Sequence, residues 1–130
     1  MRHSLASYSA AMCNCSRTSV SLSFPQKNFT QRPPTDDEMG VKILDRFTEL
    51  GGNFIDTADM YSSGQSEELI GRWLQGKDRH QLVLTTKLGS KRDDVNPNQH
   101  GLSRKHIAYS IDKSLKNLQT DFVDMYMVSE

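Results

Sequence analysis

Residues 53 to 61, NFIDTADMY, begin like a buried strand and then present two carboxylates, a hydroxyl and a phenol. A second apolar run, LVLTTK, ends on Lys87. Asp56, Tyr61 and Lys87 would together form a proton-transfer group, because an ammonium stabilises a neighbouring phenolate and a carboxylate keeps that ammonium charged and oriented. Taken singly, such residues are more typical of solvated strand ends and ordinary packing. The prediction that Tyr61 is a general acid therefore depends on their joint placement and on the sequence around them.

Three helices are predicted from start signals and apolar periods. The first begins at the capping box Thr35 to Glu38 and stops at Gly51, the second is capped by Ser66, and the third is capped by Ser103. Their apolar faces are expected to be Ile43, Leu44, Phe47 and Leu50, then Leu69, Ile70, Trp73 and Leu74, and finally Ala108, Ile111, Leu115 and Leu118.

Three apolar strands alternate with these helices, near residues 53–56, 82–87 and 122–128. Alternation of this kind indicates parallel strands covered by helices. No Gly-x-Gly-x-x-Gly follows a strand, which argues against a Rossmann dinucleotide site. We therefore predict an α/β fold, a partial (β/α)8 barrel with about three β/α units of the N-terminal half. Catalytic groups of such barrels lie at the C-terminal ends of the strands, where Asp56 and Lys87 fall.

Residues 1–34 have no apolar period and are rich in Ser, Asn, Gln and Thr, so this segment is predicted to be disordered or aberrant. Residues 35–130 are predicted to form the partial barrel. The formal net charge of zero argues against a nucleic-acid partner, and no apolar run reaches the roughly 18 residues of a membrane span. A cytoplasmic location is expected, and the alternative is that residues 1–34 act as an organelle transit peptide.

No metal site is predicted. Cys13 and Cys15 are too close for a disulfide framework, and no further cysteines are present to complete a zinc site. The histidines are expected in tail and turn segments without forming a ligand cluster: His3, His80, His100 and His106.

Three stretches, GGNFIDTADMYSSGQSEELIGRWLQ, LVLTTKLG and GLSRKHIAYSIDKSLKNLQTDFVDMYM, closely resemble the aldo-keto reductase family. The resemblance runs from about Thr35 to Met127. It implies a (β/α)8 barrel that binds NADP(H) in extended form without a Rossmann fold. It also implies reduction of small aldehydes and ketones to alcohols by hydride transfer from the nicotinamide.

The resemblance further implies a catalytic tetrad of Asp, Tyr, Lys and His. By matching motif, Asp56, Tyr61 and Lys87 take the first three places, and Asp56 would also lie near the nicotinamide ribose. The family pattern Leu-Tyr-x-x-His is replaced by MYMVSE, which puts Ser129 at the His position. We therefore expect a fragment of such an enzyme that is inactive alone. The alternatives are a non-catalytic partner-binding module, as in the potassium-channel auxiliary subunits of the family, or a truncated isoform without function.

Overall fold

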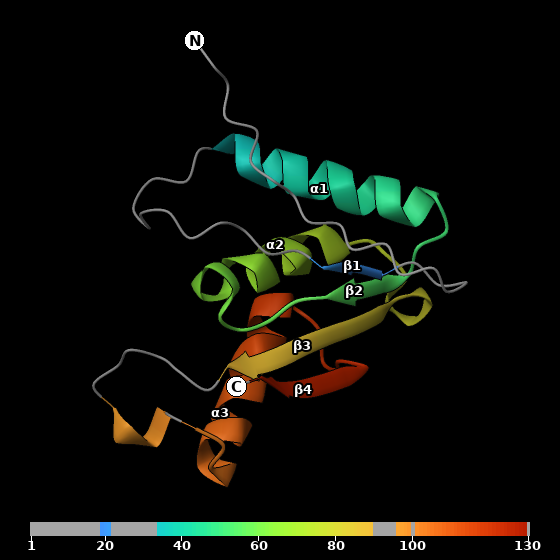
Figure 1. The fold of residues 1–130 in the computed structure, drawn as a ribbon. Helices are drawn as coiled ribbons and strands as arrows, with labels where there is room; N and C mark the ends of the chain where they lie inside the picture. The colour runs from blue at the N-terminus through green and yellow to red at the C-terminus, as the bar shows by residue number, and fades with distance from the viewer. Residues whose placement is uncertain (1–18, 22–33, 90–95, 100, 130) are drawn as a thin grey trace.

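The sheet is built from four parallel strands. A computed structural model describes residues 19–21, 34–89, 96–99 and 101–129 of the chain. The strands pair in sequence order, and their bounds are β1 Ser19–Ser21, β2 Phe54–Asp56, β3 Val83–Gly89 and β4 Met125–Ser129 (Figure 1). Because neighbouring strands run parallel, their C-terminal ends meet at one edge of the sheet.

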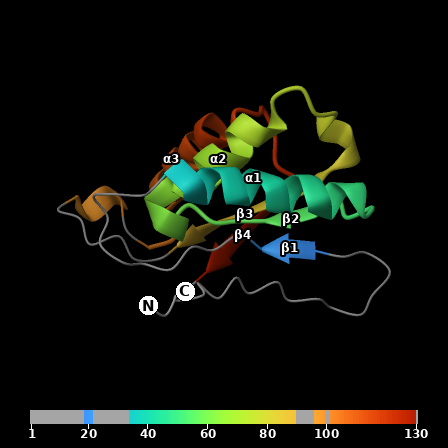
Figure 2. The same cartoon turned by 90° about the horizontal axis from the view of Figure 1, so that it is seen from above.

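The α-helices of the described residues lie on one face of this sheet (Figures 1 and 2). They are α1 Pro34–Glu49, α2 Gln65–Leu74 and α3 Arg104–Leu118. The 3₁₀ turns lie between strands and helices: η1 Tyr61–Gly64 between β2 and α2, η2 Arg79–Gln81 between α2 and β3, and η3 Pro97–Gln99 between β3 and α3. The core fills the space between helices and sheet, and its buried side chains include Leu44, Phe47, Ile55, Ile70, Trp73, Leu84 and Leu118. The alternating α and β units predicted from the sequence are therefore present.

Trp73 fixes α1 against α2. Trp73 is only 5% exposed, and its indole N–H donates to the Asp45 carboxylate on α1 at 2.8 Å. The Lys77 ammonium binds the same carboxylate at 2.8 Å and lies 5.0 Å from the centroid of the Trp73 ring. The hydrogen bonds from Lys77 and Trp73 lower the pKa of Asp45.

At the opposite end of the sheet from the strand C-termini, Arg79 and Asp124 join the starts of β3 and β4. The Asp124 carboxylate accepts from the Leu84 N–H at 2.8 Å and from the Arg79 guanidinium at 2.7 Å. Arg79 also donates to the Leu82 carbonyl at 2.8 Å and stacks on the Phe122 ring. Burial pushes the pKa of Asp124 upward, but the hydrogen bonds from Leu84 and Arg79 outweigh it and the pKa is lowered.

Strand β1 lies inside the segment 1–34 that the sequence predicts to be disordered. Ser19, Val20 and Ser21 pair with Phe54, Ile55 and Asp56 of β2, so the sheet has one strand more than predicted. The strand escapes prediction because its short sequence, SVS, has no apolar run and its place depends on backbone pairing with β2. Pro34 begins α1, and the other residues of the segment, including Cys13 and Cys15, lie outside the described residues.

The helix starts and faces are only partly as predicted. Ser103 caps α3 by accepting from the His106 N–H, as expected, but α2 is capped by Gly64 and not by Ser66. Leu50 lies beyond α1 and is 71% exposed. On α3 the buried side is His106, Ser110, Ser114 and Leu118, whereas Ile111 and Leu115 are half-buried and Ala108 is exposed. The inward side of α3 is therefore mostly small and polar, so the apolar period did not mark it.

Candidate active site

Asp56 and Lys87 meet at the C-terminal ends of two adjacent strands. Asp56 is the last residue of β2 and pairs with Thr85, so Lys87 lies two residues further along β3 on the same face of the strand. The Lys87 Nζ donates to Asp56 Oδ2 at 2.5 Å. Both side chains are largely buried, with 16% and 20% of their surface exposed. The predicted carboxylate–ammonium contact is present.

Tyr61 completes the group from the turn after β2. Its phenol oxygen lies 3.4 Å from Lys87 Nζ, and the ammonium is 5.1 Å from the ring centroid. Lys87 Nζ also donates to the Thr57 carbonyl at 3.2 Å. The ammonium therefore contacts three oxygens, from a carboxylate, a main-chain carbonyl and a phenol. The contact places a positive charge beside the phenol oxygen of Tyr61.

The chain after β2 continues along β3 before it turns away. The Thr57 N–H donates to the Thr85 carbonyl at 2.9 Å, and the Asp59 N–H donates to the Lys87 carbonyl at 3.0 Å. The Thr57 hydroxyl also lies 3.0 Å from the Ser66 hydroxyl, which links this stretch to the first turn of α2. These hydrogen bonds fix the path of the main chain between the end of β2 and Tyr61.

A left-handed turn follows Tyr61 directly. Ser62 has φ 50° and Ser63 has φ 55°, and Gly64 follows with φ 96° as the cap of α2. A left-handed backbone costs roughly 1–2 kcal/mol per residue that is not glycine. The strained turn reverses the chain direction between β2 and α2, and it leaves the Tyr61 side chain at the strand ends.

Two buried carboxylates near this turn have roles that the sequence did not predict. Glu67 is fully buried and accepts from the Thr86 hydroxyl at 2.7 Å and the Asn117 amide at 3.0 Å. Asp59 accepts from the Gly89 N–H at 3.0 Å. Burial and the charges of Asp59 and Glu67 raise the pKa of Tyr126 to about 12. Asp59 lies in the same motif as Asp56, but only the fold shows which main-chain group its carboxylate meets.

Ser129 lies at the C-terminal end of β4. Its main chain pairs with Gly89, while Lys87 pairs with Met127 on the same strand. The position that the family resemblance assigns to a histidine is thus next to the strand that carries Lys87. In the part of the chain that the structure describes, this places all four predicted positions at one end of the sheet.

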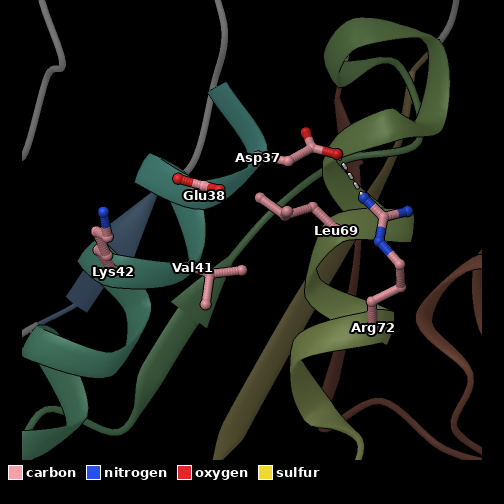
Figure 3. Close-up of a pocket in the computed structure, with 6 residues that line it drawn as sticks. All are labelled: Asp37, Glu38, Val41, Lys42, Leu69 and Arg72. Carbon is pink, nitrogen blue, oxygen red and sulfur yellow. Dashed lines mark hydrogen bonds and ion pairs between the residues drawn. The ribbon is translucent and has the colours of Figure 1, made fainter. Parts of the chain in front are cut away.

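A separate pocket lies between α1 and α2, away from this group. Figure 3 shows Arg72 of α2 directed at the Asp37 carboxylate of α1, beside the apolar side chains of Val41 and Leu69. The Arg72 guanidinium lies 2.8 Å from that carboxylate. The pocket is lined by Asp37, Glu38, Val41, Lys42, Leu69 and Arg72. None of the strand-end residues contributes to it.

Metal and membrane features are absent from the described ranges. Within them, no three His, Cys, Asp or Glu side chains are grouped as a metal ion would require. The same ranges contain no helix with both the length and the apolar character that crossing a membrane demands. His106 corrects the expectation that the histidines lie in tails and turns. It is buried in α3, with the Ser110 hydroxyl 3.4 Å from its Nδ1.

Residues 24–129 match the model of the aldo/keto reductase family. The chain belongs to this family. The match begins inside the first 34 residues, earlier than the Thr35 start indicated by the sequence motifs. With the parallel sheet and its helical layer, the family assignment confirms the predicted fold class, a partial (β/α)8 barrel.

Aldo/keto reductase relatives of known sequence and structure cover the same region. An uncharacterized oxidoreductase of Bacillus subtilis is 38% identical over 95 residues, which are 72% of this chain and 31% of that protein. An aryl-alcohol dehydrogenase of Pestalotiopsis microspora is 43% identical over 96 residues, 70% of this chain and 25% of that protein. The crystal structure of an aldo-keto reductase from Klebsiella pneumoniae in complex with NADPH is 28% identical, with a TM-score of 0.61 over 74% of this chain and 30% of that chain.

The chain spans between a quarter and a third of the length of these curated relatives.

Proposed function

We propose that this chain carries the proton-donor side of an NADP(H)-dependent carbonyl reductase site, which reduces aldehydes or ketones to alcohols. The observation that carries the proposal is the Lys87 ammonium, which joins the Asp56 carboxylate to the Tyr61 phenol. In a β/α barrel, groups at the C-terminal strand ends face the bound substrate. Membership of the aldo/keto reductase family supports the same reaction class.

Asp56 has an oxygen available for the cofactor. Its Oδ2 accepts from Lys87, whereas its Oδ1 is buried and accepts no hydrogen bond within the described structure. A buried carboxylate oxygen without a donor is costly, so a ligand hydroxyl that donates to it would be favoured. A nicotinamide ribose hydroxyl fits this requirement, and the relative from Klebsiella pneumoniae was crystallised with NADPH. The residues present therefore fit the cofactor.

The mechanism divides the work among three side chains. A bound nicotinamide cofactor would supply the hydride for the carbonyl carbon. Tyr61 hydrogen-bonds the carbonyl oxygen and gives it a proton, so that an alcohol leaves and a phenolate remains. Lys87 stabilises that phenolate until solvent returns the proton, and Asp56 holds Lys87 in place. All three roles are proposals that rest on the contacts described above.

Ser129 bears on how much of the reaction this chain performs alone. A serine hydroxyl can donate a hydrogen bond to a carbonyl oxygen, but it lacks the reach and the charge of an imidazole. We propose that turnover by residues 1–130 alone is below detection for this reason. The alternative of a non-catalytic partner-binding module predicts that a complete barrel containing these residues would bind cofactor without turning it over.

Grafting tests the proposal in a complete barrel. Residues 35–127 would replace the matching region of the Pestalotiopsis microspora aryl-alcohol dehydrogenase, so that the host supplies the fourth tetrad position. We expect NADPH oxidation with an aromatic aldehyde, and we expect Tyr61→Phe to lower kcat by at least the ~10²-fold typical of losing general acid catalysis. Lys87→Met should have an effect of the same order, because it removes the charge that stabilises the phenolate.

Tyr109→Phe is the matched control. Tyr109 is a phenol on α3 with 47% of its surface exposed, and its substitution should leave kcat unchanged. Equal kcat values for the graft and its Tyr61→Phe variant would show that Tyr61 is not the proton donor. Cofactor binding without turnover, in a graft that folds, would favour the non-catalytic alternative.

A further inference from the structure

Asp59 holds the turn that carries Tyr61 to the end of β3. Its main-chain N–H donates to the Lys87 carbonyl at 3.0 Å, and its Oδ1 accepts from the Gly89 N–H, also at 3.0 Å. Main chain and side chain of this one residue thus bind β3 on either side of Leu88. Asp59 is only 6% exposed, so water competes little for these hydrogen bonds.

The residues around the contact are closely packed. A Cβ on Gly89 would lie 2.8 Å from the Met60 sulfur and 3.4 Å from Asp59 Oδ1. On the other side of the turn, a Cβ on Gly64 would lie 3.1 Å from the Asn117 amide nitrogen and 3.8 Å from the Asp59 carbonyl oxygen. The turn is therefore confined between the end of β3 and the helix α3.

We propose that Asp59 is a positioning residue, which sets the place of Tyr61 relative to Lys87 without touching substrate or cofactor. Asp59 precedes Tyr61 by two residues, and it binds the strand that carries Lys87. Loss of the Gly89 contact would free the turn, so the 3.4 Å approach of Tyr61 to Lys87 would no longer be fixed. The catalytic meaning of this placement rests on the proposed function, but the placement itself does not.

The side-chain hydrogen bond needs an acceptor and not a charge. Asp59→Asn keeps an amide oxygen at the same place, whereas Asp59→Ala removes it. In isotope-labelled protein we expect Asp59→Ala to speed Gly89 amide exchange by roughly tenfold or more and to weaken the nuclear Overhauser contact between the Tyr61 ring and the Lys87 side chain. Asp59→Asn should restore both readouts.

Asp45→Ala is the matched control. Asp45 also accepts two hydrogen bonds, from Trp73 and Lys77, but it lies on α1 and its loss should leave the Tyr61–Lys87 contact intact. Gly89→Ala disturbs the hydrogen bond between Gly89 and Asp59 from its β3 side and leaves Asp59 unchanged. Its methyl group would push against Met60, so we expect it to weaken the Tyr61–Lys87 contact as Asp59→Ala does.

An unchanged Tyr61–Lys87 contact in both Asp59→Ala and Gly89→Ala would overturn the proposal. So would an equal loss in Asp45→Ala, because the effect would then be one of general stability. In the grafted enzyme, Asp59→Ala should lower kcat with little change in KM, and Asp59→Asn should recover it. A graft without turnover would count against the proposed function, while the Tyr61–Lys87 readout in the 130-residue chain would still decide the role of Asp59.

Discussion

At the scale of single residues, Lys87 is held by as many acceptors as it has hydrogens to donate. Asp56 Oδ2, the Thr57 carbonyl and the Tyr61 phenol lie 2.5, 3.2 and 3.4 Å from its Nζ. An ammonium has three donors, so each can be directed at one oxygen. An arginine could not reproduce this arrangement, because its planar guanidinium directs its donors in a fixed fork.

Asp124 contributes a stability that depends on pH. Its pKa is lowered in the folded protein, so its contribution is present above the unfolded value of about 3.9 and is lost as the pH falls through the folded value. We expect Asp124→Asn to lower the free energy of unfolding by about 1 kcal/mol near pH 7, after allowance for partial exposure of the Arg79 pair.

Urea denaturation at several pH values measures this effect. The difference between wild type and Asp124→Asn should shrink as the pH falls below about 4. A difference that stays constant from neutral to acid pH would mean that the substitution acts through packing and not through the charge of Asp124.

At the scale of elements, α2 and α3 approach each other through a glycine. A Cβ on Gly71 would lie 2.2 Å from the Asn117 carbonyl oxygen and 2.8 Å from the Leu118 carbonyl carbon. These are main-chain atoms that cannot rotate away. The close approach also brings Asn117 to the buried Glu67 carboxylate, so the helix pair is joined by packing and by a hydrogen bond.

Gly71→Ala should therefore destabilise the protein although alanine is the better helix former. Overpacking of this kind costs roughly 1–3 kcal/mol, compared with a gain of about 1 kcal/mol from helix propensity. Thermal or urea unfolding measures the net loss, and Glu68→Ala on the exposed side of α2 serves as control. A Gly71→Ala variant more stable than wild type would show that α2 and α3 can move apart without loss.

Sequence patterns predicted most elements because each depends on local signals. Ser103 caps α3, and apolar runs mark β3 and the site residues at strand ends. The patterns gave wrong or missing predictions where contacts between distant parts of the chain determine the structure. Ser66 is buried in the first turn of α2 because the left-handed Gly64 starts that helix, and Asp59 gains its partner only when β3 lies alongside. Residues 56, 61 and 87 were proposed as a site from their chemistry together with the family resemblance, but their contacts and distances required the fold.

At the scale of the whole molecule, β4 has a hydrogen-bonded neighbour on one side only among the described strands. Met125 and Val128 on this strand are 44% and 51% exposed. Unpaired strand edges with exposed apolar side chains are templates for pairing with another chain. Self-association through β4 is the expected behaviour in solution.

A lysine on this edge should reduce the association. We expect Val128→Lys to shift the protein toward monomer in sedimentation velocity runs over a range of concentrations, because a charged edge residue opposes strand pairing. Tyr109→Lys is the control, since Tyr109 has a similar exposure but lies on α3. Equal dissociation by both variants would assign the association to charge in general and not to the β4 edge.

Trp73 is the single tryptophan of the chain, so its fluorescence reports on the junction of α1 and α2. Trp73 is buried there, bonded to Asp45 and covered by Lys77. Its emission therefore reports one location, the seam where α1 rests on α2, free of signal from other indoles. Separation of α1 from α2 would expose the Trp73 ring to water and shift its fluorescence emission to longer wavelengths. Loosening of the Tyr61 turn alone would leave the emission unchanged. The same recording can thus distinguish local release at the strand ends from loss of the helical layer.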